Sequence, residues 1–141
     1  MLRSRRAFSA TELIVVMAVT AVLMALAAAR FIAWRDGAAV RAASAEALHV
    51  FASARELAVV RRAFVAVRFD SAAGTVELRQ AATVLVRRNL GGTYRVALSA
   101  NRDSMVYDPR GLGFGAANLS LVLSRGDAAD TLTVSRLGRV K

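Results

Sequence analysis

The sequence predicts an α+β fold, in which a long N-terminal α-helix packs on a C-terminal antiparallel β-sheet. Three patterns predict it. Residues 8–29 form an apolar run, residues 38–62 repeat their apolar side chains at helical spacing, and the chain after residue 62 alternates with a period of two. The N-terminal half of the helix is therefore expected in a membrane, and the second half is expected against the sheet.

The apolar run from Phe8 to Ala29 carries a single charge, that of Glu12. A helix of about 20 apolar residues crosses the hydrocarbon core of a bilayer, so the run is a transmembrane candidate. The run is preceded by three arginines, Arg3, Arg5 and Arg6. Because basic residues before the first span stay in the cytoplasm, we expect the N-terminus there and the following chain on the other side of the membrane.

A secretory signal peptide is an alternative interpretation of the same N-terminus. The segment Leu26-Ala27-Ala28-Ala29 has the small residues of a cleavage site, and a basic start before an apolar core is common to both kinds of segment. Glu12 does not suit this interpretation, because a carboxylate inside a membrane segment is costly and by default indicates a function and a partner. A retained anchor and a cleaved signal peptide both stay open on these residues.

The segment from residue 38 to residue 62 has the pattern of an amphipathic helix. Its apolar positions recur every three or four residues, and most polar residues fall off that stripe. We therefore expect this stripe to be buried against the sheet. It consists of Val40, Ala43, Ala47, Val50, Phe51, Ala54, Leu57 and Ala58.

Alternation with a period of two predicts short antiparallel strands in the rest of the chain. Two hairpins are expected, with loops from Asp70 to Gly74 and from Arg125 to Asp130, and Gly91-Gly92 is expected as a turn. All strands are expected in one sheet. They are predicted at residues 64–69, 75–79, 82–88, 93–99, 104–107, 119–124 and 131–135.

Composition excludes several classes of function. The formal net charge is +10, yet 56% of the residues are hydrophobic, so the apolar excess has to be local. Cysteine is absent and His49 is the single histidine, which excludes disulfides, thiolate zinc sites and multi-histidine metal sites. No helix pattern follows the glycine-rich residues 111–115, and no spacing supports a catalytic triad. Neither an enzyme nor a cofactor or metal site is predicted.

The N-terminal residues Arg5-Arg6-Ala7-Phe8-Ser9-Ala10-Thr11-Glu12-Leu13 resemble the prepilin-type signal of type IV pilins and type II secretion pseudopilins. They combine a basic leader, a small residue, a Phe and, fifth counted from that Phe, a Glu. The resemblance implies that prepilin peptidase cleaves between Ala7 and Phe8 and methylates the new N-terminus of Phe8. It also implies that Glu12 is the assembly carboxylate. The family usually has Gly where this chain has Ala7.

The spacing of Phe8 and Glu12 has a physical logic of its own. An α-ammonium group and a carboxylate are each costly in hydrocarbon and much less so as a pair. Glu12 of one subunit meets the Phe8 ammonium of a neighbour only at a defined stagger of the two helices. The pair is therefore expected to set register more than to add stability.

Two further parts of the chain resemble the GspH/FimT branch of the pilin-like proteins. One is the helix end Ala54-Arg55-Glu56-Leu57-Ala58, and the other runs from Tyr107-Asp108-Pro109-Arg110-Gly111 to the closing Gly138-Arg139-Val140. The resemblance implies a minor pseudopilin, a structural subunit of a type II secretion pseudopilus or a type IV pilus. Its implied partners are prepilin peptidase, other pilin or pseudopilin subunits and the bacterial inner membrane.

This interpretation divides the chain into three parts. Residues 1–7 form the leader peptide, residues 8–35 the transmembrane and assembly helix, and residues 36–141 a periplasmic pilin-like domain. A single membrane pass is expected, with the N-terminus in the cytoplasm.

A DNA-binding minor pilin of natural transformation is the alternative function. FimT-type minor pilins are similar to this chain at Gly138-Arg139-Val140-Lys141, near their DNA-binding C-terminal motif, and a basic exported domain suits DNA phosphates. Arg136, Arg139 and Lys141 are the predicted DNA contacts. High Arg usage also follows from a GC-rich genome, so the basic charge does not decide between the two functions.

Overall fold

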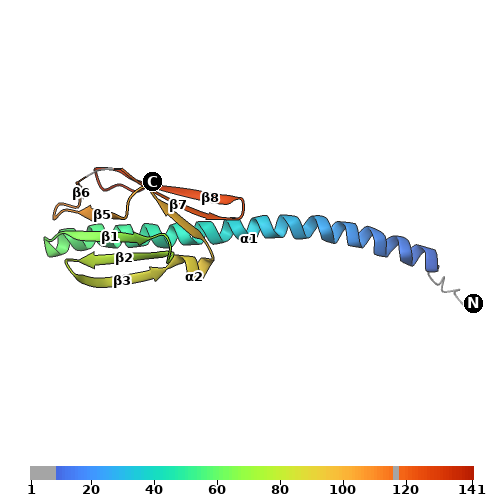
Figure 1. The fold of residues 1–141 in the computed structure, drawn as a ribbon. Helices are drawn as coiled ribbons and strands as arrows, with labels where there is room; N and C mark the ends of the chain where they lie inside the picture. The colour runs from blue at the N-terminus through green and yellow to red at the C-terminus, as the bar shows by residue number, and fades with distance from the viewer. Residues whose placement is uncertain (1–8, 116–117) are drawn as a thin grey trace, which may run out of the picture. The chain divides into compact units, whose positions relative to one another are not determined.

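The computed structural model describes residues 9–115 and 118–141, and these residues form two helices and eight strands (Figure 1). The long helix α1 spans Ala10–Arg61, and the short helix α2 spans Leu90–Tyr94. The chain divides into two compact units, Met1–Trp34 and Arg35–Lys141. The described part of the first unit is the N-terminal part of α1, and the second unit contains the rest of α1, α2 and all eight strands.

The strands form two antiparallel sheets rather than the single sheet that was expected. The five-stranded sheet has the order β3-β2-β1-β5-β6, and the three-stranded sheet has the order β4-β7-β8. The strands are β1 Val65–Asp70, β2 Thr75–Gln80, β3 Thr83–Asn89, β4 Ala97–Ala100, β5 Ser104–Tyr107, β6 Gly113–Phe114, β7 Leu119–Arg125 and β8 Ala128–Val134.

The division into two sheets follows from α2, which the sequence pattern did not predict. The expected strand at residues 93–99 is confirmed only for residues 97–99, which lie in β4, and the expected turn at Gly91-Gly92 is wrong, because residues 90–94 are helical and Leu90 is buried. Asn89 caps this helix by accepting a hydrogen bond from the Gly92 N–H at 2.6 Å. The chain then leaves β3 and pairs β4 with β7 instead.

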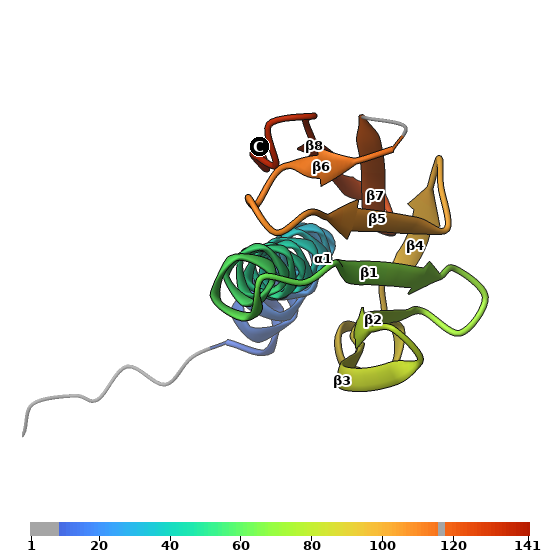
Figure 2. The same ribbon diagram turned by 90° about the vertical axis from the view of Figure 1, so that its left-hand side faces the viewer.

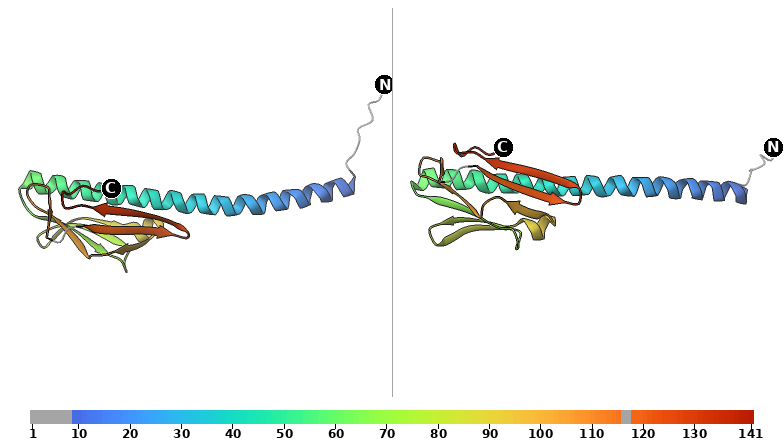
Figure 3. Two further views of the ribbon diagram at one scale, coloured as in Figure 1. Left: turned by 90° about the horizontal axis from the view of Figure 1, so that it is seen from above. Right: turned by 45° about the horizontal axis from the view of Figure 1, so that its top comes forward.

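The core of the second unit lies between α1 and the inward faces of both sheets. The predicted apolar stripe of α1 is confirmed, since its residues from Val40 to Ala58 are buried, with Leu57 partly buried against the core. Phe51 on α1 packs against Phe69 on β1, with ring centroids 5.8 Å apart. The strands lie on one side of this part of α1 (Figure 2; Figure 3, left).

Alternating burial confirms the predicted faces of β1 and β7. Val65, Val67 and Phe69 of β1 are buried, while Arg68 and Asp70 are exposed. On β7 the buried residues are Leu119, Leu121 and Leu123. The predicted six-residue loop after β7 is wrong, because Arg125 pairs with Ala128 and only two residues remain in the turn. A two-residue connection is the commonest hairpin turn, and Gly126 supplies the positive φ, +55°, that it needs.

Two acidic residues of α1 fix the sheets to the helix within the second unit. Asp36 pairs with Arg125 of β7 at 2.9 Å, and Arg125 also donates to the Tyr94 carbonyl at 2.7 Å. Glu46 accepts from the Tyr94 hydroxyl at 2.6 Å and pairs with Arg88 of β3 at 3.2 Å. The hydrogen bond to Glu46 raises the pKa of Tyr94. These contacts connect α1 to α2, β3 and β7.

Candidate functional site

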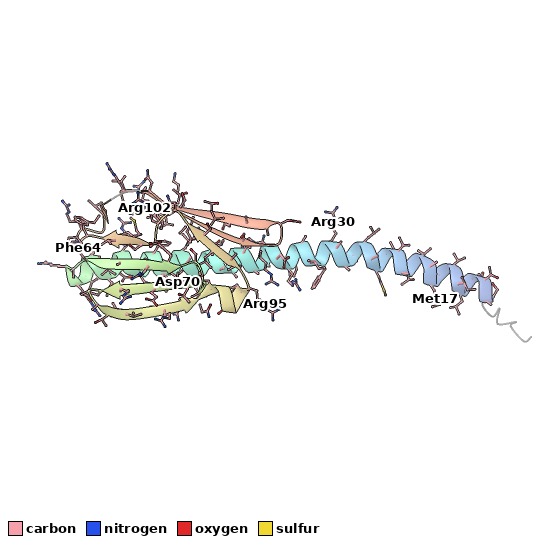
Figure 4. The ribbon with its side chains drawn as sticks, in the orientation of Figure 1. Met17, Arg30, Phe64, Asp70, Arg95 and Arg102 are labelled. Carbon is pink, nitrogen blue, oxygen red and sulfur yellow. The ribbon has the colours of Figure 1, made fainter. Side chains whose placement is uncertain are left out.

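In the first unit, α1 exposes its apolar side chains on all sides. Its large apolar residues between Leu13 and Trp34 are 50–67% exposed, and one of them, Met17, is labelled in Figure 4. A helix that is hydrophobic all round belongs in a membrane or among other apolar helices. By length and composition, α1 is able to cross a membrane.

The first turn of α1 is held by reciprocal hydrogen bonds between Ser9 and Glu12. The Ser9 N–H donates to Glu12 Oε2 at 2.9 Å, the Ser9 hydroxyl donates to the same oxygen at 3.1 Å, and the Glu12 N–H donates to Ser9 Oγ at 3.2 Å. This arrangement is a capping box, which satisfies two free N–H groups of the helix start. The role of Ser9 was not predicted, although the Ser-x-x-Glu spacing before an apolar run is the signature of the motif.

The structure describes only part of the predicted N-terminal site. Ala7 and Phe8, the predicted residues of cleavage and methylation, lie outside the described residues, as does the whole predicted leader. Glu12 lies in the first turn of α1, is exposed, and keeps its carboxylate on Ser9. A second partner can therefore reach this carboxylate from outside the helix.

The segments that resemble the GspH/FimT branch come together in the second unit. Arg55 of α1 donates through Nε to the Gly111 carbonyl at 3.1 Å. Gly138 lies against the same carbonyl, because a Cβ there would come within 2.5 Å of the Gly111 oxygen and 3.1 Å of the Tyr107 ring. Gly111 and Gly138 have φ of +77° and +69°, which glycine adopts without a steric penalty. We call Arg55, Tyr107, Gly111 and Gly138 the glycine junction.

Asp108 organises the turn that presents Gly111 to Arg55. Its Oδ1 accepts from the N–H groups of Arg110 at 2.8 Å and Leu112 at 2.9 Å, and its Oδ2 accepts from Arg110 Nε at 3.0 Å. The hydrogen bond from the Leu112 N–H, helped by those from Arg110, holds the pKa of Asp108 below its usual value in spite of burial. The carboxylate is therefore ionised at neutral pH and keeps the turn closed.

Tyr107 is completely buried at the glycine junction. Its hydroxyl has no hydrogen-bond partner within the part of the chain that the structure describes. Burial raises the pKa of Tyr107 to about 12, while the charge of Arg55 acts in the opposite direction. The Tyr107 hydroxyl therefore stays neutral at physiological pH, and the aromatic ring packs in the core.

Residues 135–141, which we call the C-terminal segment, fold back onto the end of β8. Thr133 and Lys141 exchange two backbone hydrogen bonds, of 2.8 and 2.9 Å, and Ser135 donates to the Arg139 carbonyl at 2.9 Å. Val140 thereby bridges to Val134 as an added antiparallel residue. The segment is thus held beside α1 by backbone pairing as well as by the glycine junction.

An apolar groove of about 730 Å³ runs between α1 and the C-terminal segment, and we call it the α1 groove. Arg139 and Lys141, two of the three predicted DNA contacts, border it together with Arg55. Arg136 is also exposed but is not among the lining residues. The groove is lined by Leu48, Phe51, Ala52, Arg55, Glu56, Val59 and Val60 of α1 and by Gly138, Arg139, Val140 and Lys141.

Metal-binding geometry is not found in residues 9–115 and 118–141, since no three His, Cys, Asp or Glu side chains gather there. His49 is exposed on α1. The features that stand out in these residues are the exposed apolar side chains of α1, the exposed carboxylate of Glu12 and the α1 groove.

Solved structures of one protein, the type IV minor pilin FimU of Pseudomonas aeruginosa strain PAO1, are similar to this chain. The crystal form in space group P21 has a TM-score of 0.60 at 14% sequence identity and covers 72% of this chain and 86% of the FimU chain. The form in space group P65 has a TM-score of 0.60 at 13% identity and covers 72% of this chain and 90% of the other. The chain therefore has a type IV pilin-like fold. Comparison with family models and with curated proteins gives no match.

Proposed function

We propose that this chain is a minor subunit of a type IV pilus or of a type II secretion pseudopilus. The observation that carries the proposal is a pilin-like fold whose helix α1 is apolar on all sides in its N-terminal part. Such a helix is stored in the bacterial inner membrane and leaves it when neighbouring helices replace the lipid. Lipid tails and the apolar side chains of neighbouring helices are similarly apolar, so the transfer of the helix from one to the other changes its hydrophobic free energy little.

Processing by prepilin peptidase prepares the subunit for assembly. The enzyme removes residues 1–7 by cleavage between Ala7 and Phe8 and methylates Phe8, as the sequence around residues 5–13 indicates. Residues 8–35 form the membrane and assembly helix, and residues 36–141 form the periplasmic domain. The basic leader supports this orientation, since positive residues before the first span stay in the cytoplasm.

Glu12 guides the exchange from lipid to filament. In the single chain its carboxylate is held by Ser9 through the capping box, which lowers the cost of a charged group near the start of the helix. During assembly the carboxylate pairs with the methylated Phe8 ammonium group of a neighbouring subunit. This pairing fixes the stagger of the two helices.

The variant Glu12→Ala tests the proposed function. We expect normal removal of the leader and loss of incorporation into filaments by at least about tenfold, since an unpaired buried ammonium group costs more than 1.4 kcal/mol. The measurement is the amount of processed protein in membranes and in sheared filaments, compared by immunoblot.

Ser9→Ala is the matched control for that experiment. It removes the hydroxyl from the capping box and keeps the carboxylate of Glu12. We expect filaments to incorporate this variant. Equal loss in both variants would assign the effect to the helix cap, and normal incorporation of Glu12→Ala would contradict the pairing mechanism.

DNA contact by Arg136, Arg139 and Lys141 stays a prediction. Its support is that all three side chains are exposed in one short segment, which suits contact with phosphates. Duplex DNA is therefore one of the probes in the experiment on the α1 groove described below.

A further inference from the structure

The α1 groove has an apolar floor that the fold leaves uncovered. Leu48, Val59 and Val60 are large apolar side chains of α1 that line the groove, and Val60 is 72% exposed. They lie off the buried stripe of the same helix, so they contribute little to the core of the second unit. Apolar side chains gathered in an exposed concave site are typical of an interaction surface.

The rim of the groove is positively charged. Arg55, Arg139 and Lys141 line it, and Glu56 is the only acidic residue among the lining residues. Within the described residues, none of the three cations forms an ion pair. The Nε–H of Arg55 donates a hydrogen bond to the Gly111 carbonyl, and its two terminal nitrogens bond no other described residue, so they are available to a partner. Carboxylates on a partner would complement this rim.

The wall formed by the C-terminal segment has a free backbone edge at Val140, which forms an isolated bridge with Val134. Because Thr133 and Lys141 bond each other through both backbone groups, the N–H and C=O of Val140 point away from β8. These two groups make no backbone hydrogen bond with any residue that the structure describes. Extended peptides bind at such edges by adding a strand, with alternate side chains entering pockets.

From these three features we infer that the α1 groove binds an extended acidic segment of a neighbouring filament subunit. The segment pairs with the backbone of Val140, places an apolar side chain on Val59 and Val60, and directs carboxylates to Arg139 and Lys141. A DNA duplex satisfies the cations alone, since it offers neither an apolar side chain nor a free polypeptide edge. The inference rests on the proposed role as a filament subunit and names the chemistry of one of its contacts.

Fluorescence anisotropy with the full-length protein in lipid nanodiscs tests the inference. The probe is a fluorescein-labelled peptide of sequence Gly-Glu-Leu-Glu-Val-Glu-Gly, compared with the same peptide carrying Lys in place of Glu and with a short DNA duplex. We expect the acidic peptide to bind at least about tenfold tighter than the Lys peptide, and its binding to weaken as salt is added.

Four variants separate the parts of the groove. Val60→Asp is expected to weaken binding of the acidic peptide about tenfold, through loss of apolar contact and repulsion of carboxylates. The double variant Arg139→Glu with Lys141→Glu is expected to reverse the preference toward the Lys peptide. Val140→Pro removes the backbone N–H and is expected to weaken binding, whereas Val140→Thr keeps it and has a small effect.

Matched controls lie outside the groove. Leu137→Asp changes another exposed apolar residue of the C-terminal segment, and Arg102→Glu changes an exposed cation between β4 and β5 that is labelled in Figure 4. Neither residue lines the α1 groove. Both variants are expected to bind the acidic peptide as the unchanged protein does.

Three results would overturn the inference. The first is equal affinity for the acidic and Lys peptides, and the second is no effect of Val60→Asp on the binding of the acidic peptide. The third is tight binding of the DNA duplex that the Arg139→Glu and Lys141→Glu changes abolish and Val60→Asp does not affect, which would assign the rim to nucleic-acid phosphates. Filament incorporation of Glu12→Ala is a separate readout, so failure of the proposed function is distinguishable from failure of this inference.

Discussion

Tyr107 brings a hydroxyl into the core at a cost to stability. The residue is fully buried, and no residue in the described part of the chain accepts its hydrogen bond. We expect Tyr107→Phe to raise the free energy of unfolding by about 1 kcal/mol at neutral pH, because a buried hydroxyl without a partner loses its hydration. Urea denaturation of the full chain in detergent, followed by circular dichroism, measures the change.

The pH dependence gives Tyr107→Phe a second readout. The pKa of Tyr107 is about 12 in the folded chain, above its value of 10.0 in the absence of burial. The folded state therefore disfavours the phenolate. Below pH 10, ionisation of Tyr107 does not affect the free energy of unfolding, and as the pH rises from 10 toward 12 it lowers that free energy progressively. The variant is expected to lose stability less steeply over that range. Identical alkaline profiles would contradict the burial of the phenol.

Arg62 is held in a backbone conformation that suits glycine. It follows the last residue of α1 with φ of +50°, and its N–H donates to the Val59 carbonyl while the Ala63 N–H donates to the Ala58 carbonyl. This is a Schellman motif, in which glycine is preferred because a Cβ is strained at positive φ.

We predict that Arg62→Gly stabilises the fold by about 0.5–1 kcal/mol, because it relieves this strain. Ala45→Gly is the contrasting variant, since Ala45 is exposed in the interior of α1 and its replacement by glycine costs about 1 kcal/mol in helix propensity. Thermal or urea unfolding of both variants provides the measurement. A destabilised Arg62→Gly variant would contradict the strain at this cap.

At the scale of elements, the glycine junction holds the C-terminal segment against α1 and the turn after β5. Gly138 has no room for a side chain, since a Cβ would meet the Gly111 carbonyl oxygen at 2.5 Å. An alanine at positive φ costs about 1 kcal/mol through backbone strain alone. We expect Gly138→Ala to lower the free energy of unfolding of the second unit by more than this amount, because of the additional close contact. Loss of the junction also removes one wall of the α1 groove.

Gly115→Ala is the matched control for Gly138→Ala. Gly115 has a similar φ of +82°, but a Cβ there meets no described atom within 4 Å. The difference in unfolding free energy between the two alanine variants therefore isolates the close approach at Gly138. Equal destabilisation would show that backbone strain, and not packing, explains the role of Gly138.

The long elements could be predicted because their burial is periodic. The stripe from Val40 to Ala58 and the alternation of Val65, Val67 and Phe69 each extend over several turns or pleats, so the pattern outweighs local ambiguity. α2 could not be predicted from periodicity, because five residues make too short a helix for a pattern. The Asn89 cap was its one local signal. The division into two sheets depends on which strands pair, and alternation alone carries no information about pairing.

The candidate site could be predicted only where a residue type is unusual in its sequence context. Glu12 was found because it is the one charge in an apolar run. The motifs containing Arg55, Gly111 and Gly138 were noted by resemblance, but their contact joins residues far apart in the chain, which no spacing reveals. The α1 groove could not be predicted either, because its two walls, residues 48–60 and residues 138–141, are far apart in the chain.

At the scale of the whole molecule, the chain combines two units that differ in the exposure of their apolar side chains. The described part of the first unit is a helix with exposed apolar side chains, and the second unit is a folded domain with its own core. In the proposed function, the helix serves storage and assembly, and the domain supplies the contacts that select neighbouring subunits.

The mass of the N-terminal peptide of the native protein, measured by mass spectrometry after purification from membranes, tests the central claim most directly. A processed filament subunit is expected to begin at Phe8 and to carry one methyl group on its amino terminus. A chain that still begins at Met1, or one that begins at Arg30 after removal of a secretory signal peptide, would contradict the account.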